Sequence, residues 1–364
     1  MPKDTLPSSD LSTQSNVLVS FRPADVQFWT LIALAVVVSF VCAPYPNVAR
    51  WIGFAFAAYA AVANDSIQTL GTFLASNKHR PWYVLWMFAA GIFVLTMGYS
   101  WMQYGGDVSY GRLAAKGFEQ TPMAFSPLQV LAPVVLIVLT RFKMPVSTTL
   151  LLLTSFASEM SAVSSVLVKS LSGYVLAFGL AFGLWFALQR VFEKWFTGAA
   201  HPAWTGFQWL TTGLLWSVWL QQDAANIAVY LPRSLNMVEF GAFLTVVVGG
   251  LAWIFKSGGD KIQEVVDEKE GVTDIRAATM IDLLYAVILF YFKIVSKIPM
   301  STTWVFLGLL GGRELAISYR TLRRDLLRSP KQALNMLVKD AGMASIGLIV
   351  SFVVAYFVNS RLAS

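Results

Sequence analysis

Long apolar stretches alternate with short polar ones along almost the whole chain. Several apolar stretches approach the roughly 17 to 25 residues that an α-helix needs to cross a bilayer. The pattern predicts an all-α polytopic membrane protein with about 10 to 12 transmembrane segments. The apolar segments lie at about 27–43, 49–76, 81–101, 127–141, 146–169, 171–193, 204–231, 237–256, 277–295, 300–318 and 332–358, and the larger polar stretches at 102–126, 257–276 and 313–331.

Two short motifs occur twice in the same order. "ANDSIQTLGT" at 63–72 is followed by "KMPVSTTLLLL" at 143–153, and "QQDAANIAVY" at 221–230 is followed by "KIPMSTTWVFL" at 297–307. The separation from the aspartate to the serine of each STT cluster is 82 residues in the first copy (65 to 147) and 78 in the second (223 to 301). This order and spacing indicate an internal repeat of about five segments.

A unit with an odd number of crossings places its second copy upside down in the membrane. The sequence therefore predicts two inverted repeats with discontinuous helices, related by a pseudo-two-fold axis in the membrane plane. We expect four regions: a polar N-terminal tail at 1–26, a first repeat at 27–169, a second repeat at 171–318, and a charged loop with a terminal membrane helix at 319–364.

Composition supports the membrane interpretation. Of the 364 residues, 56% are hydrophobic and only 13% are charged, and the mean hydropathy is +0.61. The net charge of +7 is spread over many loops, which argues against a nucleic-acid surface. Alternate loops place 18 of the 27 Lys and Arg residues on the N-terminal side and 8 on the other, which predicts a cytoplasmic N-terminus. We expect a multi-pass protein of a cell membrane, such as a bacterial inner membrane.

The few cysteine and histidine residues argue against disulfides and against metal sites built from these residues. The single cysteine, Cys42, allows no intramolecular disulfide and no cysteine-based metal cluster. The two histidines, His79 and His201, match no metal-binding spacing. We expect no cofactor beyond a coupling ion, which is sodium or a proton, and the sequence leaves open whether the protein forms a homodimer.

The duplicated acids are candidate cation ligands. A carboxylate at membrane depth costs several kcal/mol, so it is rare unless it faces a wet cavity or a cation. Asp65 and Asp223 occupy matched positions in apolar segments, each beside an amide residue, Asn64 or Gln222. Polar residues around Asp65 disfavour a continuous helix, and an interrupted helix exposes backbone oxygens that bind ions. We expect sodium, if it is the coupling ion, to bind at both acids.

The STT clusters are candidate anion ligands. Pro145 and Pro299 suit the first turn of a helix, where a missing N–H does no harm. Hydroxyls there, together with the free amides of a helix start, favour a bound oxyanion. A lone cluster more often only bonds to its own helix, but duplication favours function. The predicted anion ligands in these clusters are Ser147, Thr148, Thr149, Ser301, Thr302 and Thr303.

These motifs resemble those of the inorganic phosphate transporter (PiT) family of sodium- or proton-coupled symporters. Each half of that family carries a motif like G-A-N-D-V-A-N-x-x-G-T and, further on, P-x-S-T-T. Here the pairs read "VANDSIQTLGT" with "PVSTT", and "QQDAANIAV" with "PMSTT", over about residues 50 to 310. The resemblance implies a transport domain built from both repeats that binds phosphate and sodium near the midplane. It places the acidic position at Asp65 and Asp223, and the later asparagine at Gln68 and Asn226.

The departures from the family pattern leave the anion open. Gln68 and Gln222 replace asparagines, Val62 replaces a glycine, and Leu150 and Trp304 stand where histidine often follows STT. Related sulfate permeases exist, and sulfate is also tetrahedral. Phosphate carries a proton at neutral pH and needs a hydrogen-bond acceptor for it, which a carboxylate supplies. Sulfate needs only donors, so the two aspartates favour phosphate over sulfate.

Other functions and acids remain as alternatives. An anion channel or a sensor could keep the same fold, whereas an enzyme with Ser147 or Ser301 as nucleophile lacks an evident base, so we expect no enzyme. Glu159 and Glu239 are equally compatible with structural pairing and with coupling. The stretch 258–284, "GGDKIQEVVDEKEGVTDIRAATMIDLL", has the pattern of a solvated amphipathic helix.

Overall fold

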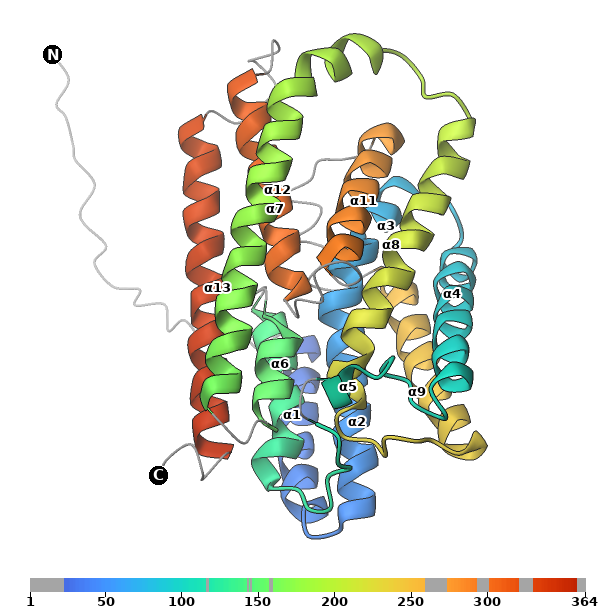
Figure 1. The fold of residues 1–364 in the computed structure, drawn as a ribbon, viewed down its shortest axis with the longest axis vertical. Coiled ribbons are helices and arrows are strands. Elements are labelled where there is room, and N and C mark those ends of the chain that lie inside the picture. Colours follow the sequence, from blue (N-terminus) through green and yellow to red (C-terminus); the bar gives the residue numbers. More distant parts are fainter. Residues whose placement is uncertain are drawn as a thin grey trace, which may run out of the picture.

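The computed structural model describes residues 23–115, 118–142, 144, 146–156, 160–258, 274–292, 301–320 and 330–358. Over these ranges the chain forms helices and no strand (Figure 1). The elements are α1 (Pro23–Cys42), α2 (Pro46–Ala61), η1 (Val62–Ser66), α3 (Ile67–Ser76), α4 (Trp82–Gln103), α5 (Arg112–Ala115), α6 (Pro127–Arg141), η2 (Thr149–Leu153), α7 (Met160–Trp195), α8 (Ala203–Ala228), α9 (Met237–Lys256), α11 (Ile275–Phe290), α12 (Thr302–Arg320) and α13 (Pro330–Val358).

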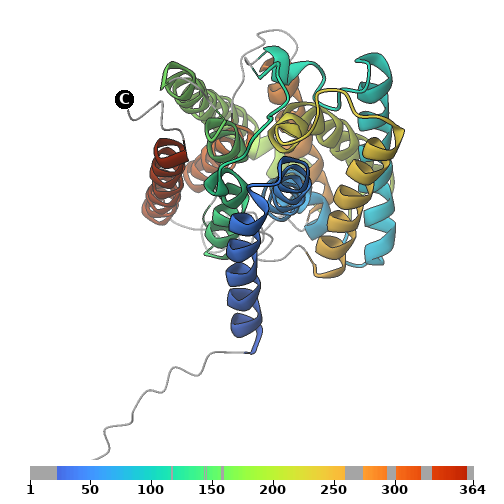
Figure 2. The same cartoon turned by 90° about the horizontal axis from the view of Figure 1, so that it is seen from below.

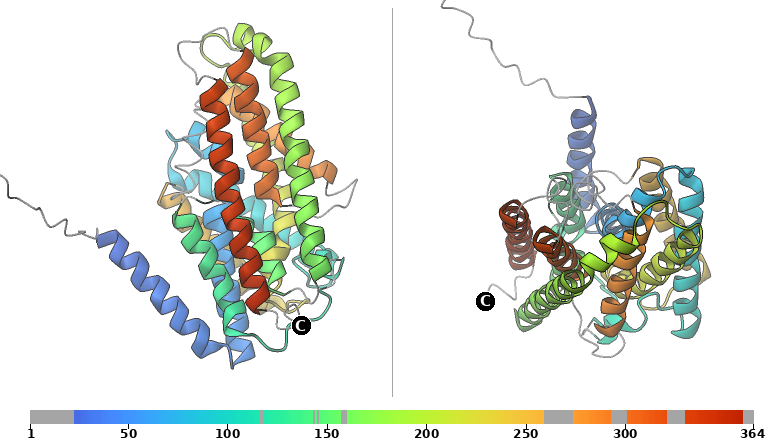
Figure 3. Two further views of the ribbon diagram at one scale, coloured as in Figure 1. Left: turned by 90° about the vertical axis from the view of Figure 1, so that its left-hand side faces the viewer. Right: turned by 90° about the horizontal axis from the view of Figure 1, so that it is seen from above.

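Five described helices are long and apolar enough to cross a membrane, namely α1, α4, α7, α9 and α13. The prediction of an all-helical fold is confirmed over the described residues, and these five helices are compatible with the expected membrane protein. The first of them is the most exposed, because only 6% of its apolar window is buried inside the protein. Figures 2 and 3 show α1 projecting away from the other helices. Leu31, Leu34 and Val37 are each more than half exposed on it, which suits contact with lipid.

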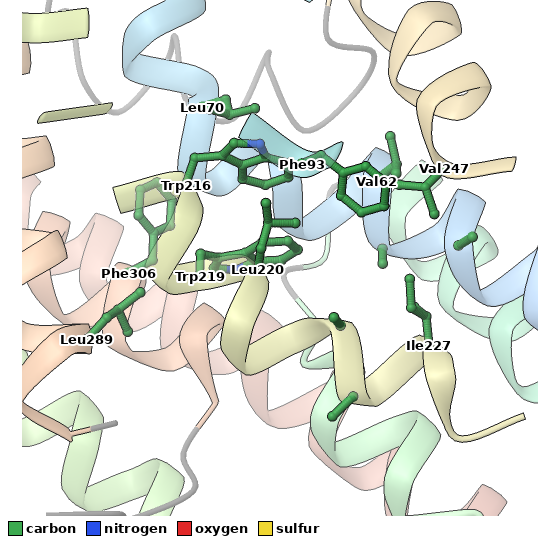
Figure 4. Packing of buried hydrophobic residues seen from close by; sticks show 14 of the residues in the cluster. Val62, Leu70, Phe93, Trp216, Trp219, Leu220, Ile227, Val247, Leu289 and Phe306 are labelled. Carbon is green, nitrogen blue, oxygen red and sulfur yellow. The ribbon is translucent and has the colours of Figure 1, made fainter. Parts of the chain in front are cut away.

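The protein core surrounds α8, which lies between α3, α11 and α2. Its C-terminal half is almost entirely buried. Trp216 and Trp219 stack with ring centroids 4.9 Å apart, and the Trp216 indole donates to the Ala89 carbonyl of α4 at 2.9 Å. Figure 4 shows these two rings beside Phe93 of α4 and Phe306 of α12. The apolar packing therefore encloses the C-terminal half of α8, whereas Phe207, Leu210 and Leu214 of its N-terminal half are exposed.

Helices α7 and α12 approach each other closely because α12 presents glycines. A Cβ on Gly308 would lie 2.4 Å from the Tyr174 carbonyl oxygen, and one on Gly312 would lie 2.2 Å from that of Phe178. Small residues four apart allow this contact between membrane helices. Helix α7, 36 residues long, continues through the break expected between the segments at 146–169 and 171–193, so that predicted boundary is wrong.

The two aspartate segments differ in backbone. Helix α2 passes into α3 through the π-helical turn η1, which contains Asp65. Helix α8 instead continues without interruption through Asp223 to Ala228. The sequence disfavours a continuous helix around Asp65, and no turn like η1 occurs within α8. The expected polar tail at 1–26 also ends early, since α1 begins at Pro23 and Asp25 pairs with Arg141.

Candidate functional site

Asp65 is buried in η1 and accepts hydrogen bonds at both carboxylate oxygens. Oδ2 accepts from the Thr148 hydroxyl. Oδ1 accepts from the Asn64 side-chain amide and, at 3.4 Å, from the Thr303 hydroxyl. The residue is only 1% exposed, and no Lys, Arg or His of the described ranges forms an ion pair with it. Neutral donors from three parts of the chain thus surround a buried carboxylate.

Asp223 lies near the end of α8 and is also buried. Its Oδ1 accepts from the Asn226 side-chain amide, one turn further on. The same oxygen lies 3.5 Å from the Thr149 hydroxyl, which is at the long limit for such a bond. The spacing of three residues places the aspartate and the asparagine on one face of a regular helix. The second acid thus contacts both its own helix and the first STT cluster.

One hydrogen-bond network joins the two acids. The Asn226 amide donates to the Thr149 hydroxyl at 2.9 Å and to the Thr148 hydroxyl at 3.2 Å. Thr148 in turn donates to Asp65. The network is completely enclosed, since its members are at most 3% exposed. Residues separated by more than 200 positions in the sequence, from 64 to 303, thus form a single polar centre.

The serine of each STT cluster caps a helix. The Ser147 hydroxyl accepts from the Leu150 amide at 3.2 Å, and the Ser301 hydroxyl accepts from the Trp304 amide at 3.3 Å. Both clusters therefore are helix starts, as predicted. The helical residues begin at Thr148 and Thr302, after the prolines, and Pro145 and Pro299 lie outside the described residues.

Of the remaining predicted ligands, some join the hydrogen-bond network and others lie apart from it. Gln68 donates to Asn64 Oδ1 at 3.2 Å, so it joins the network through one intermediate. Gln222 donates instead to the Leu289 carbonyl of α11 at 3.1 Å, which separates it from the carboxylates. The Thr302 hydroxyl forms no hydrogen bond within the described residues, and its carbonyl accepts from the Tyr285 hydroxyl at 2.9 Å. The structure thus brings together Asn64, Asp65, Gln68, Thr148, Thr149, Asp223, Asn226 and Thr303.

Arg112 is a neighbour of this centre that the sequence analysis treated only as a loop charge. Burial lowers the pKa of its guanidinium, and the negative charge of Asp223 opposes that shift. The Nε atom is buried without a hydrogen-bond partner in the described part of the chain. Its short helix, α5, packs against α8. No motif surrounds Arg112 in the sequence, so only the fold reveals that this cation acts on Asp223.

A loop between α4 and α6 covers the end of the molecule at which α8 terminates. Arg233, just after α8, donates to the carbonyls of Phe118 at 2.8 Å and Gln120 at 2.9 Å. It also donates to Leu231 in its own segment at 2.7 Å. Burial lowers the pKa of Arg233 to about 10. One side chain therefore ties the covering loop to the end of α8.

Two cavities lined by described residues lie away from the polar centre. One of about 370 Å³ is lined by Trp185, Phe192 and Arg313 among others. Another of about 450 Å³ lies between α4 and α8, beside Phe88 and Trp209. Neither includes a residue of the polar centre, in which Asn226 Oδ1 is buried without a hydrogen-bond partner in the described ranges.

The other acids have different positions from those expected. Glu239 is half-buried and forms a capping box at the start of α9, because its carboxylate accepts from the Asn236 backbone amide at 2.9 Å. Glu159 lies outside the described residues, as does most of the acidic stretch at 258–284. Asp282 belongs to that stretch but is 1% exposed, so the expectation of a solvated helix is wrong at this residue. Its neighbours in sequence are apolar, which was the available signal.

Comparisons with known proteins identify no relative. No protein-family model, no curated protein and no solved structure matches this chain.

Proposed function

We propose that this protein is a secondary active symporter that imports inorganic phosphate together with sodium ions or protons. The observation that best supports this proposal is the enclosed network that joins Asp65, Asp223 and threonines of both STT clusters. A buried carboxylate among neutral donors favours binding of a cation. Clustered hydroxyls at helix starts favour binding of an oxyanion. Membership of the PiT family is part of this proposal and rests on the motifs alone.

The hydroxyls supply a physical basis for coupling. A threonine hydroxyl carries one hydrogen, so it donates either to a carboxylate or to an anion, and not to both. Thr148 donates to Asp65 in the structure, and the Thr303 hydroxyl lies 3.4 Å from both Asp65 Oδ1 and the Val146 carbonyl oxygen. A cation or a proton on Asp65 would take over stabilisation of the carboxylate and release these two hydroxyls. They would then turn toward phosphate, so the anion would bind best after the cation.

Inverted repeats would give both sides of the membrane access to one centre. Thr148 and Thr149 come from the first half of the chain, and Asp223 and Thr303 come from the second. In transporters built from inverted repeats, one repeat moves against the other around a fixed site. The bonds between Asp65 and Thr303 and between Asp223 and Thr149 cross the two halves, so such a movement would change both pairs together.

Arg112 adds a positive charge on the Asp223 side of the centre. A guanidinium offers five N–H donors in a planar arrangement that suits phosphate oxygens. We assign to Arg112 the attraction of the anion toward the centre. Sulfate would be attracted as well, and the aspartates, which accept the proton of phosphate, favour phosphate at the centre itself.

Uptake into proteoliposomes tests the function. Labelled phosphate should accumulate under an inward sodium or proton gradient, and unlabelled phosphate should compete better than sulfate. Uptake that responds to neither gradient would contradict symport. Competition by sulfate alone would replace phosphate with sulfate as the substrate. Currents far above transporter turnover would favour an anion channel, and binding without accumulation would favour a sensor.

A further inference from the structure

A row of polar side chains follows one face of η1 and α3. Asn64, Gln68, Thr72 and Ser76 recur every four residues, which places them above one another on a helix. The first two are hydrogen-bonded to each other. Ser76 accepts a hydrogen bond from the Gln208 side-chain amide of α8. The row therefore extends from the Asp65 centre to the last residue of α3.

The row ends at a polar junction between α3 and α8. Asn77 donates to Gln208 Oε1 at 2.8 Å. Asn77 is 1% exposed, and its Oδ1 is buried without a hydrogen-bond partner in the described ranges. The next two residues, Lys78 and His79, are exposed in the turn before α4. The junction thus holds an unused acceptor directly beneath the surface of the molecule.

Asp282 of α11 lies midway along this row. Its Oδ1 accepts from the Thr72 hydroxyl at 2.6 Å, and its Oδ2 accepts from the Thr212 hydroxyl of α8. Thr72 is seven residues beyond Asp65, or about 10 Å along a helix. Asp282 is 1% exposed and forms no ion pair with a described Lys, Arg or His. It is therefore a third buried carboxylate, separate from the Asp65–Asp223 centre.

The surroundings suit a proton better than a metal ion. Asp282, Thr72 and Thr212 provide four side-chain oxygens, while the three helices are regular here, so their backbone carbonyls bond within the helices. Sodium needs more oxygen ligands than that, whereas a proton needs one. A hydroxyl can donate or accept. Thr72 and Thr212 can therefore donate to the carboxylate, and either can accept once Asp282 is protonated.

We propose that Asp282 is a proton-binding site on a polar path that connects the Asp65 centre with the turn between α3 and α4. This inference rests on the proposed transport function and specifies a proton as one coupling ion. A hydronium ion at the turn loses a proton, which forms an O–H bond with a carboxylate oxygen of Asp282. On release that bond breaks and a water molecule takes the proton.

Few other charged groups act on Asp282. Helix α3 contains no titratable residue, and the only one in α8 is Asp223, eleven residues beyond Thr212. On α11 itself, Arg276 is paired with Asp274, and Tyr285 donates to Thr302. On α12, Arg313 and Glu314 lie 3.8 Å apart. Arg313 lines a cavity with Ala277 and Met280, which does not include Asp282.

Infrared difference spectroscopy of the purified full-length protein in lipid tests the site directly. Spectra taken across a pH titration should contain a carboxylic-acid carbonyl band that is missing from Asp282→Asn. Asp274→Asn is the matched control, because it removes an acid from the same helix and asparagine still caps that helix. The control should keep the band. Identical spectra for the wild type and Asp282→Asn across the titration would overturn the proposal.

A second pair of variants keeps the test valid if Asp282→Asn does not fold. Thr212→Val removes one donor to the carboxylate, and Thr212→Ser keeps it. The band of the valine variant should titrate at a pH higher by about one unit, because the charged form loses a hydrogen bond. Equal midpoints in the two variants would show that this hydroxyl does not act on a titrating Asp282, which contradicts the proposal.

A transport assay distinguishes failure of this inference from failure of the proposed function. In proteoliposomes, Asp282→Asn should exchange phosphate across the membrane but lose at least about tenfold of the uptake driven by a pH gradient. Full retention of that uptake would overturn the inference while leaving phosphate transport intact. If the wild type moves no phosphate, the proposed function fails, and the infrared spectra still decide whether Asp282 binds a proton.

Discussion

The Asp65 and Asp223 segments have the same residue types but hold their carboxylates differently. Asp65 lies in a π-helical turn and accepts from Asn64, Thr148 and Thr303. Asp223 lies on an unbroken α-helix and accepts from Asn226 and, at 3.5 Å, from Thr149. A π-helical turn widens a helix locally and occurs frequently at functional sites. Asp65 therefore lies in a widened turn and Asp223 in a regular helix, although each contacts a threonine of the other half of the chain.

The two STT clusters also differ in how many of their threonines reach the hydrogen-bond network. Thr148 and Thr149 both reach the network, whereas only Thr303 does so from the second cluster. Duplicated sequence has thus produced matched helix starts but different contacts. We infer that the first half contributes more to the centre, and substitutions at equivalent positions of the two halves should reveal it.

Removing either carboxylate charge should have the largest effect. Asp65→Asn and Asp223→Asn should each reduce coupled uptake by about 100-fold or more, because two hydrogen bonds to a charged group are worth about 3 kcal/mol together. Proteoliposome uptake measures the loss, and the amount of folded protein in the membrane serves as the control. Wild-type rates in both variants would remove the proposed cation site.

Thr148 and Thr302 provide a direct test of the inequality. Thr148→Val removes a donor to Asp65 and should raise the apparent KM for the anion at least about tenfold, since a hydrogen bond to a charged group is worth about 1.5 to 3 kcal/mol. Thr302→Val removes a hydroxyl without a partner in the described residues, so its KM should stay within about twofold. Equal increases would show that the two clusters act alike when the anion is bound.

Arg112 tests the electrostatics of the Asp223 side. Arg112→Gln should raise the apparent KM for phosphate by about threefold to tenfold, and less at high salt, because screening weakens long-range attraction. Arg112→Lys retains the charge and is the matched control. A KM that is equally raised in both variants would indicate a structural role for the guanidinium.

Arg233 tests whether the covering loop is held by one side chain. Arg233→Met should increase amide hydrogen exchange at about residues 118–121 by roughly tenfold, because the loop loses its bonds to Phe118 and Gln120. Arg50→Met is the control, since Arg50 donates to a single loop carbonyl, that of Pro122. Unchanged exchange in Arg233→Met would mean that other contacts hold the loop.

The smallest effect is expected at Gln222. Its amide bonds to the Leu289 carbonyl rather than to a carboxylate. Gln222→Met, which keeps the volume, should change the KM for the coupling cation by less than about twofold, whereas Asn64→Leu should change it by about tenfold. A large effect at Gln222 would show that Gln222 and Asn64 have equivalent roles, as the sequence predicts.

The sequence alone determined the class of the protein and most members of its polar centre. Apolar segments of bilayer length require helices, because only a helix satisfies its own backbone within one segment. The duplicated motifs identified Asp65, Asp223 and both STT clusters as candidate ligands. Such inferences are possible because hydropathy and short motifs are local properties of the chain.

Only the tertiary structure decided which of these residues meet. It placed Thr148 beside both Asn226 and Asp65, turned Gln222 toward α11, and brought Arg112 within electrostatic reach of Asp223. It also buried Asp282, which belongs to an otherwise charged stretch, between two threonines that lie 140 positions apart at 72 and 212. Such contacts depend on how helices rotate and pack against one another, and no local pattern contains that information.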